Sequence, residues 1–143
     1  MPGKGEDITT RFGIDISDLK AGIQDANRQI GLANSEFKAA SSGMEDWGNS
    51  ADGLSAKIKQ LTAVQEAETI KLKLLKEQYR QVAEEQGETS EGAQNLLIKI
   101  NNQEAAVNKT TAQLKSYENR LSDLKAAEEE AARAAETQKN AYE

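Results

Sequence analysis

The chain has 143 residues, of which 37% are hydrophobic and 29% charged, and its formal net charge at pH 7 is −6. It contains no histidine and no cysteine, so the commonest acid–base residue, the thiol nucleophile and the thiolate metal ligands are all missing. This composition argues against an enzyme, a metal site or another cofactor, and the acidic charge argues against direct nucleic-acid binding.

Residue usage favours long helices. Ala, Glu, Lys, Leu and Arg together make up roughly half of the chain, as in coiled coils, and the single proline is Pro2. No apolar run approaches the roughly 20 residues that span a bilayer, so we expect no membrane segment in this fragment. The predicted fold class is all-α.

The first residues do not follow the helical pattern. Residues 1–7 are polar and glycine-rich and are expected to form a flexible tail. Over residues 8–16, apolar side chains including Phe12 alternate with other residues, which is the period-two pattern of a half-buried strand. A lone strand leaves its backbone edge unpaired, so this strand-like lead-in, with Phe12 as a possible partner contact, would pair with another chain. The alternative is an extended segment laid on the helix that follows.

Three helices are predicted over about 18–40, 52–86 and 90–142. Ser17 can cap the first, Ser50 or Asp52 the second, and Thr89 or Ser90 the third. Glycine-containing segments at 41–53 and 87–92 separate them and are the predicted hinges within a helical region over 17–143. The helical pattern still runs where the sequence stops, so we expect a fragment of a longer chain.

A single heptad frame passes through all three helices. Counted from Ile16 in alternating steps of three and four, 29 of the 37 positions are apolar, where the chain-wide hydrophobic content predicts about 14. A 3.5-residue period of this length is the signature of a left-handed coiled coil. The predicted self-association seam consists of Leu19, Ile23, Ile30, Phe37, Leu54, Ile58, Leu61, Leu72, Leu75, Tyr79, Val82, Leu96, Ile100, Val107, Leu114, Tyr117, Leu121 and Leu124.

The frame crosses both glycine-containing segments without losing phase. When helices run end to end, a shared heptad phase keeps their apolar seams on the same side. Helices that are joined by a loop and pack independently do not require a shared phase. We therefore predict an extended coiled-coil rod that forms homo-oligomers to cover its seam. The alternative is an antiparallel helical hairpin turning at 87–92, with Tyr79 opposite Ile100; the free fragment is a natural candidate for this form.

Some residues in the frame are not simple apolar seam residues. Gln65, Glu68, Gln103, Thr110 and Glu128 are polar; they either fix the register and the number of strands or reflect a loosely specified coil. Trp47, between the first two helices, is either a seam residue or a possible partner contact, and we favour the seam. The carboxylate clusters at 84–85 and 128–130 are expected to be solvated helix faces.

Residues 7–61 resemble a known family. The similar stretches are Asp7-Ile-Thr-Thr-Arg-Phe-Gly-Ile-Asp-Ile-Ser-Asp-Leu-Lys-Ala-Gly-Ile-Gln-Asp-Ala-Asn-Arg-Gln-Ile, its continuation Gly31-Leu-Ala-Asn-Ser-Glu-Phe-Lys-Ala-Ala-Ser-Ser-Gly-Met-Glu-Asp-Trp, and Ala51-Asp-Gly-Leu-Ser-Ala-Lys. Together they resemble the amino-terminal region of tail tape measure proteins of long-tailed phages and prophages of Gram-positive bacteria. Beyond residue 61 the sequence is similar to coiled coils in general.

The resemblance implies a structural protein of the virion. Such a protein fills the lumen of the tail tube, acts as a ruler for tail length, and is ejected before the DNA passes. Its implied partners are the tail tube protein and the tail assembly chaperones, and its implied locations are the tail tube lumen and, during assembly, the host cytoplasm. Two other interpretations are a generic coiled-coil scaffold and a small secreted helical-hairpin protein, although the Trp-x-Gly turn of the latter is absent.

Overall fold

The computed structural model describes residues 16–141, and every regular element in this range is helical. The elements are α2 (Ile16–Ser41), the short 3-10 helix η1 (Trp47–Asn49), α3 (Ala51–Gln86) and α4 (Glu91–Ala141). The all-α prediction is therefore confirmed. The long helices begin and end within two residues of the predicted bounds, a difference typical of helix ends. Phe12 and nearly all of the predicted strand-like lead-in lie outside the described residues.

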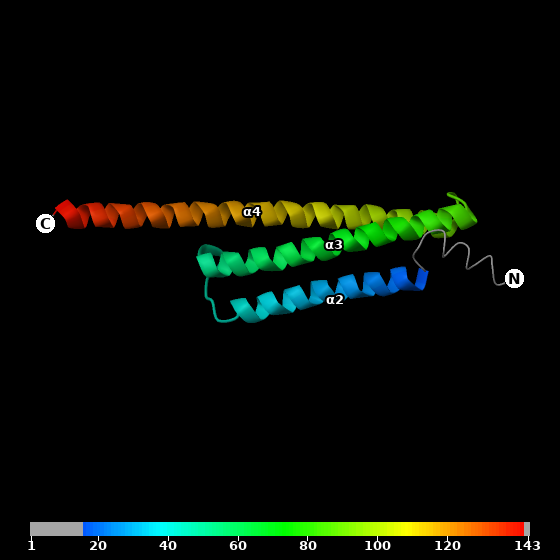
Figure 1. The fold of residues 1–143 in the computed structure, drawn as a ribbon, viewed down its shortest axis with the longest axis horizontal. Helices are drawn as coiled ribbons and strands as arrows, with labels where there is room; N and C mark the ends of the chain where they lie inside the picture. The colour runs from blue at the N-terminus through cyan, green and yellow to red at the C-terminus, as the bar shows by residue number, and fades with distance from the viewer. Residues whose placement is uncertain (1–15, 142–143) are drawn as a thin grey trace.

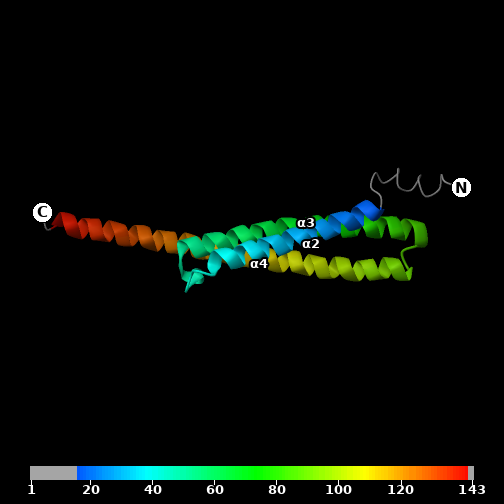
Figure 2. The ribbon, with the colours of Figure 1, turned by 90° about the horizontal axis from the view of Figure 1, so that it is seen from below.

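The helices are arranged side by side. The chain doubles back after α2 and again after α3, so that α2 and α4 both pack against α3 and run antiparallel to it (Figure 1). Turning the molecule shows the same elongated arrangement (Figure 2). In this single chain the described helices lie side by side and do not run end to end.

The connection before α3 is compact because two residues favour a tight turn. The Ser50 side chain accepts a hydrogen bond from the Gly53 backbone N–H at 3.0 Å and so caps α3. At Gly53, an added Cβ would lie only 2.2 Å from the Trp47 carbonyl oxygen. A glycine at this position therefore lets η1 fold back onto the first turn of α3.

The connection between α3 and α4 depends on Gly87. Its φ of 98° lies in the region that favours glycine, and its N–H donates to the Ala83 carbonyl at 2.9 Å. Three residues later, the Ser90 hydroxyl accepts from the Ala93 N–H at 3.2 Å and caps α4. The turn thus closes one helix and begins the next within four residues.

The apolar core follows the heptad frame along the two interfaces. The apolar side chains that are buried at frame positions are Leu19, Ala26 and Ala33 in α2, Leu54, Leu61 and Leu75 in α3, and Ala93, Ile100 and Leu114 in α4. Val64 and Ala67 of α3 are also buried and each lie one residue before a frame position. Every other residue of the predicted seam is partly buried. Within this chain the seam therefore joins helices of the same molecule, and burial of each Leu or Ile contributes up to about 1.5–3 kcal/mol.

Candidate interaction surfaces

A polar layer interrupts the α3–α4 interface. Glu68 is only 9% exposed, and its carboxylate accepts a hydrogen bond from the Thr110 hydroxyl. Its backbone carbonyl accepts another from the Gln103 side-chain amide at 2.9 Å. Nearby, the Gln65 amide donates to the Thr111 hydroxyl at 2.7 Å. These bonds are made in one register only, so the layer can specify how α3 and α4 align.

Four of the five polar frame residues singled out from the sequence meet at or beside this layer. The fifth, Glu128, is exposed in the last third of α4. Thr111, which completes the bond from Gln65, was not predicted because it lies one residue off the frame. Gln81, only 2% exposed, was also missed, and a polar residue outside the frame gives no sequence signal of burial.

An aromatic cluster lies where η1 meets the three helices. The Trp47 ring is 5.0 Å from that of Phe37, edge to face, and 5.8 Å from that of Tyr117. Trp47 therefore packs within its own chain, together with two residues of the predicted seam. Its role as a partner contact stays a prediction, as does that of Phe12.

Two cations border this cluster. The Lys57 ammonium lies 4.7 Å from the centre of the Phe37 ring and 5.7 Å from that of Trp47, within the range of cation–π attraction. Partial burial lowers the pKa of Lys57 below its usual value of 10.5. The Arg120 guanidinium lies over the Tyr117 ring and donates to the Gly48 carbonyl at 3.1 Å. Arg120 thereby ties α4 to η1.

A groove of about 520 Å³ lies where α2, α3 and α4 converge. Each helix contributes one lysine to it: Lys20, Lys71 and Lys99. The remaining lining residues are amide-bearing or apolar, namely Gln24, Asn27, Gln78, Asn102, Gln103, Ile23 and Leu75. Among the described residues, no carboxylate lines this "lysine groove", although the whole chain is acidic. Whole-chain charge did not reveal it, because the three lysines are far apart in the sequence.

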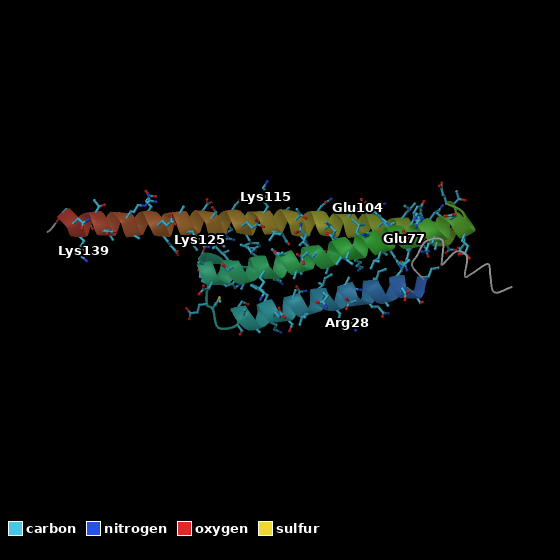
Figure 3. All side chains as sticks on the ribbon, viewed as in Figure 1. Arg28, Glu77, Glu104, Lys115, Lys125 and Lys139 are labelled. Carbon is cyan, nitrogen blue, oxygen red and sulfur yellow. The ribbon has the colours of Figure 1, made fainter. Side chains whose placement is uncertain are left out.

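The last part of α4 projects beyond the other helices (Figure 1). Every residue from 126 to 141 is exposed, and we refer to this segment as the α4 overhang. It contains seven alanines and four glutamates against one arginine and one lysine, a net charge of −2. Lys139, near its end, extends into solvent (Figure 3). The overhang is thus an acidic helix that no other described part of the chain covers.

Neither a membrane-spanning helix nor a cluster of metal ligands occurs in the part of the chain that the structure describes. No helix there is long and apolar enough to cross a membrane. Nor does any group of three or more His, Cys, Asp or Glu side chains lie close enough to hold a metal ion.

Comparison with known proteins gives no relative: no protein family, no curated protein and no solved structure matches this chain.

Proposed function

We propose that this chain is the amino-terminal part of a phage tail tape measure protein. In this role it fills the lumen of the tail tube during assembly, sets the tail length as a molecular ruler, and leaves the tube before the DNA. The observation that carries the proposal is the heptad frame, which keeps its phase through both turns of the folded chain. The resemblance of residues 7–61 to the amino-terminal region of tail tape measure proteins is the reason for connecting this frame with a phage tail.

The proposal assigns two arrangements to the same seam. In the folded-back chain the seam residues pack between α2, α3 and α4, as in the structure. In the tail, the helices open at 42–50 and 87–90 into a rod, and the exposed seams of neighbouring copies cover one another as a coiled coil. Continuous phase has a physical purpose in the second arrangement only, because a straight coiled coil requires all its seam residues on one side.

Dimensions support a ruler. At a rise of about 1.5 Å per residue, the 51 residues of α4 span about 77 Å. The described range 16–141, opened into one helix, would span about 190 Å. Removing residues from such a rod shortens it by a known amount, which makes length measurement testable. A generic scaffold would share the helices but would not control tail length.

The test is a pair of deletions in the parent phage gene. Removing Leu96–Lys109 deletes 14 residues, or two heptads, and leaves the frame in phase; the expected tail is shorter by about 21 Å, or by the nearest whole ring of the tube. Removing Leu96–Ala105 deletes 10 residues and breaks the phase, so the yield of tails should fall further despite the smaller loss.

Electron micrographs of the two phages would give the tail lengths and yields. Tails of normal length and number from both would refute the ruler role of this segment. Proportional shortening with equal yields would keep the ruler but exclude the heptad phase from its mechanism.

A further inference from the structure

The interface between α3 and α4 does not require both helices to belong to the same chain. Its contacts are the apolar layers and the bonds of the polar layer, among them those from Thr110 to Glu68 and from Gln65 to Thr111. These bonds do not involve the connecting residues 87–90. An α4 from a second copy, laid against α3 in the same antiparallel register, would therefore make the same bonds.

The connection between α3 and α4 can itself become helical. α3 ends at Gln86 and α4 begins at Glu91, and residues 87–90 contain no proline. The Gly87 N–H already donates to the Ala83 carbonyl at 2.9 Å, which is the bond that it would make inside a helix. If residues 87–90 adopt helical dihedral angles, α3 and α4 become one continuous helix.

The heptad frame stays in phase through such a helix. It passes from Val82 to Gln86, Thr89 and Ala93 in steps of four, three and four residues. The seam of α3 therefore continues into the seam of α4 on the same side of the helix. A tight turn does not require this phase, whereas a continuous helix whose whole seam is covered by one partner does.

A second open copy, running antiparallel, supplies what an open chain loses. Each α3 regains an α4, and α2 stays on its own α3 because the connection at 42–50 is unchanged. Around the two-fold axis, Gln86 of each copy comes level with Thr89 of the other. This new layer pairs an amide with a threonine hydroxyl, as Gln65 and Thr111 already do at 2.7 Å.

We propose that two copies of this chain exchange α4 by opening at residues 87–90, so that each α3 packs against the α4 of the other copy in an antiparallel dimer. The contact is isologous and closes after two copies. Exchange of an identical element is a low-cost route to a dimer because the interface is already formed in the single chain. This inference does not rest on the ruler role, since it concerns one turn and one pair of copies.

The first test changes the turn and measures dimerisation. Samples are unfolded in urea and refolded over a range of concentrations, and their mass is measured by sedimentation equilibrium. The wild-type chain should be monomeric when dilute and increasingly dimeric when concentrated. Circular dichroism would confirm that the helix content of every variant is unchanged.

Two variants of the turn should act in opposite directions. Gly87→Ala disfavours the turn, whose φ is 98°, and favours the helix. Its dimer Kd should fall at least about 25-fold, because two turns are released per dimer and each is disfavoured at least about fivefold. Inserting Gly-Ser-Gly-Ser-Gly between Glu88 and Thr89 should weaken the dimer, because it relaxes the turn and interrupts the helix. Gly43→Ala, in the other connection, is the control and should leave the Kd unchanged.

The second test shows which helix is exchanged. The chain has no cysteine, so Gln65→Cys and Thr111→Cys can be placed in separate Gly87→Ala chains that are mixed, refolded and treated with a short thiol crosslinker. These positions face one another across the α3–α4 interface, so covalent dimers should form. The control mixture carries Asn34→Cys and Gln60→Cys, whose native side chains meet across the α2–α3 interface at 2.8 Å. It should give no covalent dimer, because α2 stays with its own α3.

Several results would overturn the proposal. Chains that remain monomeric at every concentration, Gly87→Ala included, would do so. A dimer without crosslinking between positions 65 and 111 would place the contact outside the α3–α4 interface. Equal crosslinking between positions 34 and 60 would show that α4 is not the helix exchanged, and equal effects of Gly87→Ala and Gly43→Ala on the Kd would exclude residues 87–90 as the hinge.

Discussion

At the scale of single residues, the buried carboxylate of Glu68 depends on Thr110. Thr110→Val removes the hydroxyl that donates to this carboxylate and should lower the free energy of unfolding by about 1–3 kcal/mol. Adding Glu68→Leu removes the unpaired carboxylate as well and should recover most of this loss. Urea unfolding followed by circular dichroism would give the double-mutant cycle, and simple additivity would show that the two side chains are not coupled.

Lys57 provides a pH-dependent test of the aromatic cluster. Burial lowers its pKa below 10.5, so the unfolded chain binds this proton more tightly than the folded one. The resulting cost to stability is fully present below the folded-state pKa and is relieved as the pH rises from there towards 10.5. The difference in unfolding free energy between wild type and Lys57→Met should therefore shift in favour of the wild type over that range. A constant difference would indicate that Lys57 is freely solvated.

The heptad frame predicts which residues of α4 contribute to the free energy of unfolding. Leu121 is a partly buried seam residue and Lys125, one turn further along α4, is exposed. Leu121→Asp should lower the free energy of unfolding by about 1–3 kcal/mol because it places an unpaired charge against apolar side chains. Lys125→Asp is the matched control and should change the melting temperature little. Equal effects in thermal unfolding would mean that the frame is misassigned.

At the scale of the elements, the turn between α3 and α4 requires a glycine. Gly87→Ala forces a side chain into a backbone conformation with φ of 98° and should cost about 1–3 kcal/mol. Gly43→Ala is the control, since Gly43 has a negative φ and no neighbour within 4 Å of an added Cβ. Thermal unfolding should separate the two variants, and a neutral Gly87→Ala would mean that the turn adopts another conformation in solution.

The extents of the helices could be predicted from the sequence because their signals are local. Ser50 and Ser90 cap α3 and α4 as ordinary N-cap residues do, and the apolar period marks the buried face. Their mutual arrangement could not be predicted in this way. A heptad seam with constant phase supports both a rod and a folded-back chain, and the choice in one chain depends on turns such as that at Gly87 and on bonds such as those of Glu68.

The lysine groove and the cations beside the aromatic cluster were not found from the sequence, for a related reason. Lys20, Lys71 and Lys99 come together only because three helices lie side by side. Similarly, Lys57 and Arg120 meet the aromatic rings across elements that are far apart in the chain. Such contacts depend on how the helices align with one another in the fold. The apolar period of the sequence shows only which face of each helix is buried.

At the scale of the whole molecule, the folded-back arrangement, in which Lys115 of α4 points away from α3 (Figure 3), can be measured directly. The chain has no cysteine, so Lys59→Cys and Glu118→Cys introduce two unique labelling sites on exposed positions of α3 and α4. In the folded-back chain these helices lie about 8–10 Å apart, whereas in a rod the two positions, which are 59 residues apart in the sequence, would be separated by about 89 Å. Energy transfer between dyes should be high in the free chain, and low transfer would favour the rod.

The positions of the two ends of the described chain have a mechanical consequence. Ile16 at the start of α2 and Ala141 at the end of α4 lie towards opposite ends of the molecule (Figure 1). A pull that separates them acts along the helix axes and loads the α2–α3 and α3–α4 interfaces in shear. Under such a load all the layers of an interface resist together, whereas a pull across the axes would peel them apart one by one. The hydrogen bonds of the polar layer at Glu68 and the hydrogen bond from Arg120 to Gly48 then resist sliding of α4 along α3 and η1. Opening under tension requires all of these bonds to break.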